Sequence, residues 1–176
     1  MDTDVELFKP VDAFLHHHAF SGFEADDRVP TGIMASEQYG TWAKENLAYY
    51  DGKHFLTEDG SPDTTTNVSI ITAYMLNKGL ILNNTYQDFE GLFTMYPKDF
   101  FCPKDFISQQ IDITSNTVCI HHFNMSWHSE TVRIEWKIRW FCNKWLPASM
   151  AKPCTSFLIK RLHELRCILH KLRTSD

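Results

Sequence analysis

Two carboxylates near the start of the chain have the spacing of a metal-binding pair. Asp2 and Asp4 lie two positions apart, so in an extended segment both side chains project from the same face. Carboxylate oxygens are ligands that Mg²⁺ and similar hard cations prefer, and such cations bridge to phosphate groups. The sequence therefore makes Asp2 and Asp4 candidate ligands for Mn²⁺ or Mg²⁺. An Asp-x-Asp spacing also arises by chance, so a solvated acidic segment is the alternative.

Two adjacent histidines form a second candidate group. His121 and His122 lie within the apolar run 118–123, and Ser126 and Trp127 follow shortly after it. Because neighbouring residues in a strand face opposite sides, at most one of these histidines can enter a given site. An imidazole can bind a metal ion, and a tryptophan ring can stack on a ligand. The alternative is one core histidine and one surface histidine, with Trp127 packed in the core.

The elements that would position these residues alternate between strands and helices. Short apolar segments bounded by turn residues predict strands at 19–24, 31–35, 92–96 and 117–123. Helical spacing and capping signals predict helices at 37–50 after Ser36, at 64–78 before Gly79, from the Ser129 cap to Trp145, and at 155–173. Pro147 and Pro153 are expected to mark a linker between the last two helices. This mixture predicts the α/β fold class.

The second predicted helix begins with a polar run that contains a further candidate. Thr64, Thr65, Thr66 and Asn67 are typical of a helix N-terminus. Capping is the first interpretation of this run, and an Asn67 side chain that faces a ligand is the second.

Charge divides the chain into an acidic body and a basic tail. Residues 1–130 carry 7 Lys+Arg and 19 Asp+Glu, a net charge of −12, whereas residues 131–176 carry 10 and 3, a net charge of +7. The acidic body argues against nucleic acid as a partner. The basic tail fits an anionic membrane surface.

The basic tail also has two amphipathic segments. Trp136, Trp140 and Trp145 lie among basic residues, which fits either a helix at a membrane interface or a core-packed helix. In the last predicted helix, leucines recur at every third or fourth position from Leu158 to Leu172.

Several of these segments, in this order, resemble one known protein family. The similar segments are Asp2–Pro10 (Asp-Thr-Asp-Val-Glu-Leu-Phe-Lys-Pro), Ser21–Glu24, Thr31–Ile33, Thr65–Val68, Tyr96–Asp105, and His121–Phe123 with Ser126 and Trp127. Together they resemble the bacterial capsular-polysaccharide glycosyltransferases of glycosyltransferase family 32, which carry an Asp-x-Asp motif. The resemblance covers residues 2–130.

The resemblance implies a metal-dependent glycosyltransferase with a GT-A fold. Such an enzyme moves a sugar from a nucleoside-diphosphate sugar to a glycan or lipid-linked acceptor, with retention at the anomeric carbon. Residues 1–130 would be the C-terminal part of the GT-A domain without its N-terminal strands, and residues 131–176 a basic, Trp-containing helical tail.

The same resemblance implies roles for individual residues. Asp4 would bind the metal, and Asp2 would contact the metal or the donor. His122, in preference to His121, would approach the metal or the diphosphate. The donor-binding set is completed by Asn67, Ser126 and Trp127, of which the last two would close over the diphosphate.

Two other functions are alternatives to the transferase. The chain would be a non-catalytic remnant if it keeps these motifs without the activity, or a peripheral membrane-binding module that acts through residues 131–173. No apolar run approaches the roughly 18 residues of a spanning helix. Five scattered cysteines without a Cys-x-x-Cys pair favour a reducing compartment. We therefore expect a cytoplasmic protein, with peripheral attachment at the inner membrane face as the alternative.

Overall fold

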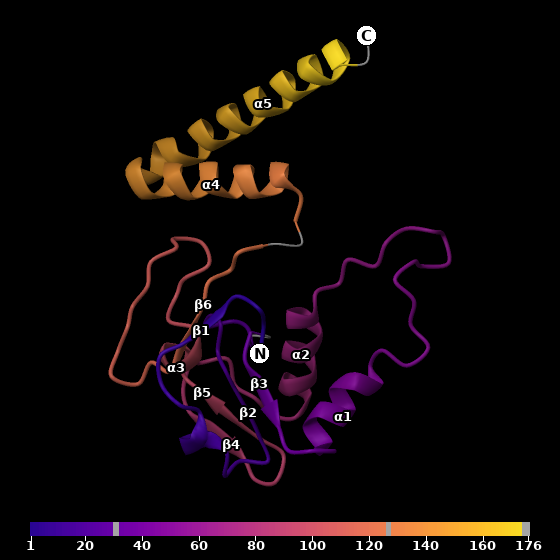
Figure 1. The fold of residues 1–176 in the computed structure, drawn as a ribbon, viewed down its shortest axis with the longest axis vertical. Helices are drawn as coiled ribbons and strands as arrows, with labels where there is room; N and C mark the ends of the chain where they lie inside the picture. Colours follow the sequence, from indigo (N-terminus) through magenta and orange to yellow (C-terminus); the bar gives the residue numbers. More distant parts are fainter. Residues whose placement is uncertain (30–31, 126–127, 174–176) are drawn as a thin grey trace. The chain divides into compact units, whose positions relative to one another are not determined.

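The computed structural model describes residues 1–29, 32–125 and 128–173, and it has a mixed α/β fold (Figure 1). This content confirms the α/β class predicted from the sequence. The chain divides into two compact units. The first unit is Met1–Asp105 with Gln110–Phe123, and the second unit is Phe106–Gln109 with the chain from Asn124 onward. The division therefore falls before the expected boundary at 130, and one internal loop belongs to the second unit.

A four-stranded sheet forms the centre of the first unit (Figure 1). Its strands, in spatial order, are β3 (Met34–Ser36), β2 (Ala19–Gly22), β5 (Phe93–Tyr96) and β4 (Gln87–Phe89). β2 and β5 run parallel, whereas both outer pairs are antiparallel. Because parallel neighbours need a long crossover, the chain between them has room for α1 (Thr41–Ala48) and α2 (Asn67–Asn77). The strands predicted around β2, β3 and β5 are confirmed, and β4 was not predicted.

Side-chain alternation along β2 and β5 buries both faces of this sheet. One face packs against α1 and α2, in a cluster that includes Ala19, Phe93, Met95, Trp42, Ile71 and Met75. The opposite face packs against the short 3-10 helix Asp12–Phe14 and against α3 (Lys98–Phe101), in a cluster that includes Phe20, Phe14, Phe101 and Cys119. Most of the buried apolar side chains of the first unit therefore belong to two clusters, one on each side of the sheet.

A second, two-stranded sheet lies beside the second of these clusters. β1 (Val5–Leu7) and β6 (Cys119–His121) pair antiparallel, with Val5 opposite His121 and Leu7 opposite Cys119. β6 confirms the strand predicted at 117–123, although it is shorter. β1 overlaps the extended segment expected at the start of the chain, although it begins only at Val5.

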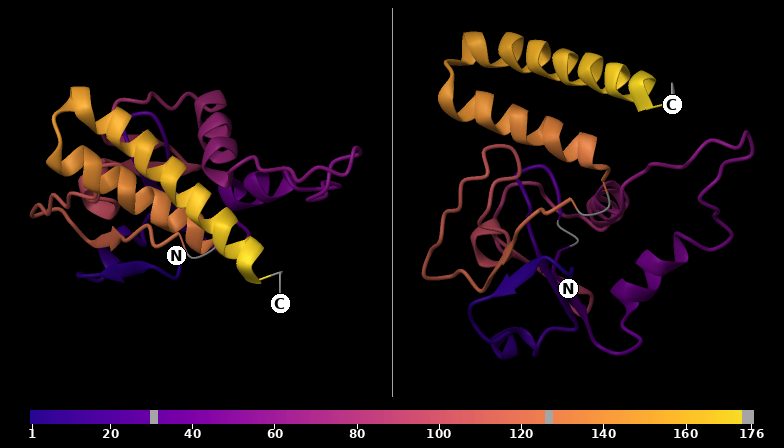
Figure 2. Two further views of the ribbon diagram at one scale, coloured as in Figure 1. Left: turned by 90° about the horizontal axis from the view of Figure 1, so that it is seen from above. Right: turned by 45° about the horizontal axis from the view of Figure 1, so that its top comes forward.

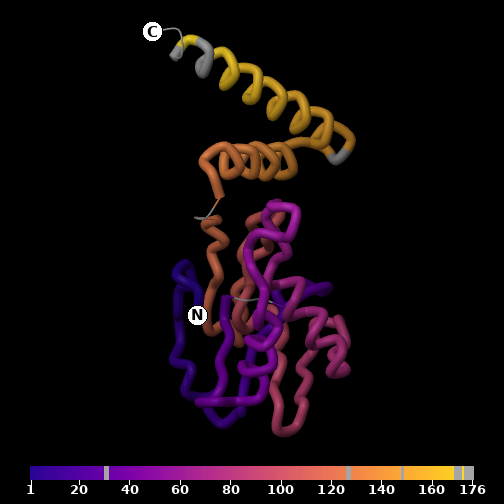
Figure 3. The backbone as a smooth tube through the Cα atoms, turned by 90° about the vertical axis from the view of Figure 1, so that its right-hand side faces the viewer, coloured from indigo at the N-terminus to yellow at the C-terminus, as the bar shows by residue number. Residues whose placement is uncertain are grey.

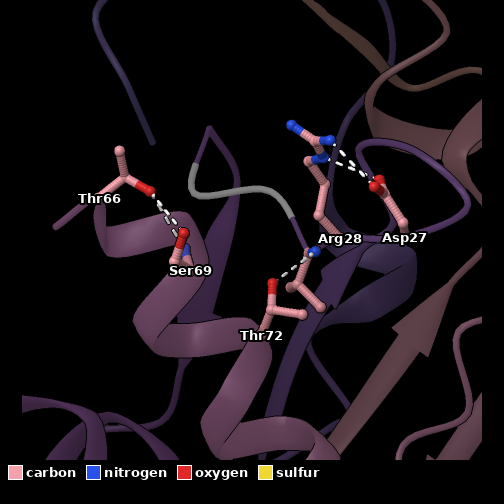
Figure 4. A network of polar contacts seen from close by, with 6 residues as sticks. Asp27, Arg28, Thr66, Ser69 and Thr72 are labelled. Carbon is pink, nitrogen blue, oxygen red and sulfur yellow. Dashed lines mark hydrogen bonds and ion pairs between the residues drawn. The ribbon is translucent and has the colours of Figure 1, made fainter.

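The start of α2 agrees with the predicted capping signal. The Thr66 hydroxyl accepts a hydrogen bond from the Ser69 N–H at 3.3 Å. Farther along the helix, the Thr72 hydroxyl accepts one from the Val29 N–H at 3.1 Å (Figure 4). Gly79 follows the helix with a φ of +98°, a conformation that glycine adopts without strain.

The start of α1 differs from the prediction. Ser36 is the last residue of β3, where it pairs with Ala19, and its hydroxyl donates to the Glu37 carbonyl at 3.1 Å and caps no helix. The helix begins later, after an N-cap at Gly40. Residues 49–66, which join α1 to α2, project from the first unit as a long loop (Figure 2).

The second unit is a pair of consecutive helices joined by a short turn (Figure 3). α4 (Glu130–Trp145) begins as predicted, since the Ser129 hydroxyl accepts a hydrogen bond from the Val132 N–H at 3.5 Å. α5 (Ala148–Arg173) contains Pro153, so the predicted linker between Pro147 and Pro153 is wrong. Pro153 is the sixth residue of α5, where its ring removes one N–H donor from the second turn while its fixed φ stays compatible with a helix.

The Trp-rich segment of the second unit is partly core and partly exposed. The Trp136 and Phe106 rings meet edge to face with centroids 4.8 Å apart. The Trp140 Nε1–H donates to the Ser108 carbonyl at 2.6 Å, whereas Trp145 is 65% exposed. Trp136 and Trp140 are therefore half-buried through contacts with the loop Phe106–Gln109, whereas Trp145 is exposed. Within the described residues, no helix is long and apolar enough to cross a membrane.

Candidate functional site

The Asp-Thr-Asp motif forms a turn, not the extended segment expected from its spacing. The Val5 N–H points to the Asp2 carbonyl at 3.4 Å, and β1 begins only at Val5. Neighbouring backbone holds this turn in place. The His122 N–H donates to the Asp4 carbonyl at 2.9 Å, and the Asp2 N–H donates to the Gly32 carbonyl at 2.8 Å. Both carboxylates are therefore anchored next to the paired ends of β1 and β6.

This turn brings the two carboxylates to one of the two predicted histidines. His121 Nε2 lies 3.2 Å from Asp4 Oδ1 and 3.9 Å from Asp2 Oδ2. One ligand atom from each of these three residues lies within 4.8 Å of the other two. Ligand atoms that share one Mg²⁺ or Ca²⁺ ion, each at about 2.0–2.6 Å from it, are at most about 4–5 Å apart. The Asp2–Asp4–His121 cluster therefore has the dimensions of a metal site.

Burial is graded across the cluster. The side chains of His121 and Asp4 are 12% and 15% exposed, whereas that of Asp2 is 51% exposed. Burial lowers the pKa of His121, although the Asp4 and Asp2 carboxylates act in the opposite direction. A neutral imidazole keeps a lone pair for a metal ion. The exposure of Asp2 leaves one side open to a water molecule or a ligand oxygen.

Gly32 makes room for the His121 ring. A Cβ atom at Gly32 would lie 2.8 Å from His121 Nδ1, closer than side-chain atoms normally approach. Nδ1 is buried and has no hydrogen-bond partner among the residues that the structure describes. The Phe123 ring lies 4.2 Å away, centroid to centroid. Gly32 was predicted only as part of a strand, because its contact with His121 joins segments far apart in the sequence.

His122 does not belong to this cluster. Its Nε2 lies 2.8 Å from the Glu6 Oε2, which pairs it with a β1 residue outside the Asp-Thr-Asp turn. The sequence favoured His122 over His121, and the structure brings His121 to the carboxylates instead. The register of β1 against β6, with Val5 opposite His121, decides between the two histidines.

Lys104 is a further charged group near the cluster. Its Nζ donates to the His122 carbonyl at 2.6 Å. Burial lowers the pKa of Lys104, and the Asp4 carboxylate acts in the opposite direction. The Lys104 side chain is half-buried. The one signal that could have pointed to it is its place within the motif segment Tyr96–Asp105.

The other predicted donor-binding residues have no demonstrated connection with the cluster. Asn67 is the exposed first residue of α2, and its Oδ1 accepts a hydrogen bond from the Val68 N–H at 3.0 Å. That contact is a local one at the helix start. Ser126 and Trp127 lie outside the described residues.

Comparisons with protein-family models, curated proteins and solved structures found no match to this chain. Its function is therefore inferred from the geometry of its own residues and from the motifs in its sequence.

Proposed function

We propose that Asp2, Asp4 and His121 bind a divalent metal ion that holds the diphosphate of a nucleotide-sugar donor. The protein would then act as a glycosyltransferase on a glycan or lipid-linked acceptor. One observation carries this proposal: three ligand atoms from the Asp-Thr-Asp turn and from β6 lie within 4.8 Å of one another. The parallel β2–β5 pair with its helical crossover is compatible with a GT-A-type sheet.

The ligand chemistry favours Mn²⁺ over Mg²⁺. Mg²⁺ is held almost entirely by oxygen ligands, whereas imidazole suits first-row transition metals. The cluster offers two carboxylates and one imidazole nitrogen. A bound ion of this kind would compensate the negative charge that develops on a departing diphosphate. The chain's own contribution is to fix the two carboxylates through the turn and the imidazole through the pairing of β6 with β1.

Calorimetric titration of the purified chain with MnCl₂ tests the metal site. Asp4 is mostly buried beside His121, so we expect Asp4→Asn to weaken Mn²⁺ binding by at least about tenfold, the order of a lost charged ligand. Asp51→Asn is the matched control, because Asp51 is an exposed aspartate in the loop after α1. If Asp4→Asn binds Mn²⁺ with unchanged affinity, the Asp2–Asp4–His121 cluster is not the metal site.

Titration with UDP-sugars and GDP-sugars in the presence of Mn²⁺ tests the transferase. Metal-dependent donor binding followed by sugar transfer or donor hydrolysis supports it. Mn²⁺ binding without affinity for any such donor would instead favour the non-catalytic alternative.

A second candidate function, peripheral membrane binding, is favoured by the surface of the second unit. On α5, Phe157, Leu165 and Leu172 are 57%, 59% and 63% exposed. On α4, Trp145 is 65% exposed, and Lys144 Nζ lies 5.5 Å from the centroid of its ring. The second unit contains 10 Lys+Arg and 4 Asp+Glu, a net charge of +6. Exposed apolar side chains among basic ones suit a bilayer with anionic headgroups.

Co-sedimentation with lipid vesicles tests this second function. We expect the chain to bind vesicles that contain phosphatidylserine or phosphatidylglycerol, and to bind weakly to vesicles of phosphatidylcholine alone. Equal binding to both kinds of vesicle, or to neither, would contradict an electrostatic contact with the bilayer.

A further inference from the structure

Two cysteines face each other in the helical hairpin of the second unit. Cys142 lies on α4 and Cys154 lies on α5. Both thiols are free, and the two side chains interact as hydrogen-bond partners. Contact between two thiols from different helices is the first requirement for a disulfide bond.

A separate contact shows that the two cysteines lie at the same level of the hairpin. His163 Nε2 of α5 lies 2.8 Å from Glu135 Oε1 of α4. At a rise of about 1.5 Å per residue, Cys142 lies about 10 Å from Glu135 along α4. By the same rise, Cys154 lies about 14 Å from His163 along α5. The two lengths agree to within one helical turn, so the pairing of the helices places Cys142 beside Cys154.

Small side chains separate the two helices at this level. Ala151 and Thr155 of α5 are 5% and 6% exposed, and Cys142 of α4 is 0% exposed. Cys154 follows Ala151 by three residues, so it lies at the edge of the same buried stripe. Figure 1 shows α5 beside α4 next to the turn that joins them. A disulfide needs Cα atoms within about 7 Å of each other, and small residues at a helix contact favour such an approach.

The two thiols differ in their access to solvent. Cys142 is fully buried, whereas Cys154 is half-buried. Burial first, and then the hydrogen bond with Cys142, raises the pKa of Cys154. Because the thiolate is the nucleophile in disulfide exchange, the reaction begins at Cys154 and becomes faster as the pH rises.

The other three cysteines are less suited to this reaction. In the first unit, Cys102 and Cys119 are 1% and 0% exposed, and burial raises the pKa of each to about 12. Each of these two thiols donates to a backbone carbonyl. Cys167 is exposed, but it follows Cys154 on the same helix at a distance of about 20 Å along the axis. The structure therefore favours one pair for an intramolecular bond.

We propose that Cys142 and Cys154 form a reversible disulfide that ties α4 to α5 when the chain meets a low-molecular-weight disulfide such as oxidised glutathione. The Cys154 thiolate attacks one sulfur of the reagent, forms a mixed disulfide and releases one thiolate of the reagent. The Cys142 thiolate then attacks the Cys154 sulfur and releases the second. The two protein thiols lose their protons and are oxidised to one disulfide, and the reagent is reduced to two thiols. This site is independent of the proposed metal centre.

Mass spectrometry of the full chain tests the bond. The chain is treated with oxidised glutathione at about pH 8, where more of the thiol is ionised. The remaining thiols are then blocked with N-ethylmaleimide, and the chain is digested without reduction. We expect a linked pair of peptides that contain Cys142 and Cys154, two hydrogen atoms lighter than the reduced pair and separated by dithiothreitol. If Cys154 does not react, or if glutathione remains on Cys154 in the parent chain, the proposal is overturned.

Three variants assign the two chemical steps. Cys154→Ser replaces a half-buried thiol with a group of similar size and should abolish the linked pair. Cys142→Ala should stop the reaction after its first step, so that glutathione accumulates on Cys154. Cys167→Ser is the control, because Cys167 is exposed and lies outside the pair, and it should leave the link unchanged. If Cys167→Ser also prevents the link, the reaction runs through Cys167 and the proposal is wrong.

Hydrogen exchange tests whether the bond ties the two helices together. A cross-link restricts the opened states of the hairpin. We therefore expect amide exchange in α4 and α5 to be slower by about tenfold or more in the oxidised chain, with no change in the strands of the first unit. Equal exchange rates for α4 and α5 in the reduced and oxidised chains would contradict the proposed tie.

Discussion

The two units of this chain differ in how deeply their central elements bury apolar residues. In the first unit, Phe20, Phe93 and Met95 of the central strands are at most 3% exposed. In the second unit, Phe157 and Leu165 of α5 are 57% and 59% exposed. The charges differ as well. The first unit has 7 Lys+Arg and 18 Asp+Glu, a net charge of −11, and the second unit has a net charge of +6.

The difference follows from the number of layers in each unit. A sheet with helices or a second sheet on both faces can bury every side chain of its central strands. Two helices can bury only the stripes along which they meet, as at Cys142 of α4 and Ala151 of α5, which are 0% and 5% exposed. Apolar residues beyond those stripes stay at the surface. The first unit therefore buries side chains on both faces of its central strands, whereas the second unit exposes apolar side chains of α5 among basic ones.

The largest expected effect is on stability. Phe101 is 1% exposed and its ring contacts Phe14 at 5.1 Å between centroids, so Phe101→Ala should reduce the free energy of unfolding by about 3–5 kcal/mol. Phe157→Ala in the second unit should change it by no more than about 0.5 kcal/mol. Urea unfolding followed by circular dichroism measures both. If both variants lose the same free energy of unfolding, the proposed difference in burial between the two units is wrong.

The next effect is on the metal cluster in the first unit. A Cβ at Gly32 would lie 2.8 Å from His121 Nδ1, so Gly32→Ala must displace the ring. Overpacking of this kind costs about 1–3 kcal/mol, and we expect Mn²⁺ affinity to fall by about tenfold or more. The control is Gly60→Ala, where nothing lies within 4 Å of the added Cβ and where the φ of +79° confines any strain to the exposed loop 49–66. If both variants bind Mn²⁺ like the parent chain in calorimetry, His121 is not a ligand.

The smallest effect concerns the charge of the second unit. Each basic residue near an anionic membrane contributes about 1 kcal/mol, so Lys144→Gln should lower vesicle affinity about fivefold. Lys44→Gln removes an exposed lysine from α1 in the first unit and should leave vesicle affinity unchanged. Co-sedimentation at increasing salt measures both. A larger loss of vesicle affinity for Lys44→Gln than for Lys144→Gln would mean that the first unit contacts the membrane, and it would contradict this prediction.

Local signals in the sequence were sufficient for most of the regular elements. The N-caps at Thr66 and Ser129 were recognisable because capping depends on a side chain and a backbone N–H three residues away. The apolar runs of β2 and β5 were recognisable for a similar reason, since strand alternation is a property of adjacent residues. These features determined the α/β class before any contact between distant segments was known.

The composition of the candidate site was predicted only in part. Asp2 and Asp4 were named from their spacing, and His121 was named as the less favoured of two histidines. Gly32 and Lys104 were missed as neighbours of the cluster. Both lie near it through contacts between segments that are far apart in the chain.

The sequence by itself determined the helices α2 and α4, the strands of the central sheet apart from β4, and the division into an acidic and a basic part. Only the tertiary structure decided that the Asp-Thr-Asp motif is a turn and that His121, not His122, reaches it. The physical reason is register. Shifting a strand pair by one residue exchanges the side chains on its two faces, and the register of β1 against β6 is set by packing between residues at opposite ends of the first unit's sequence.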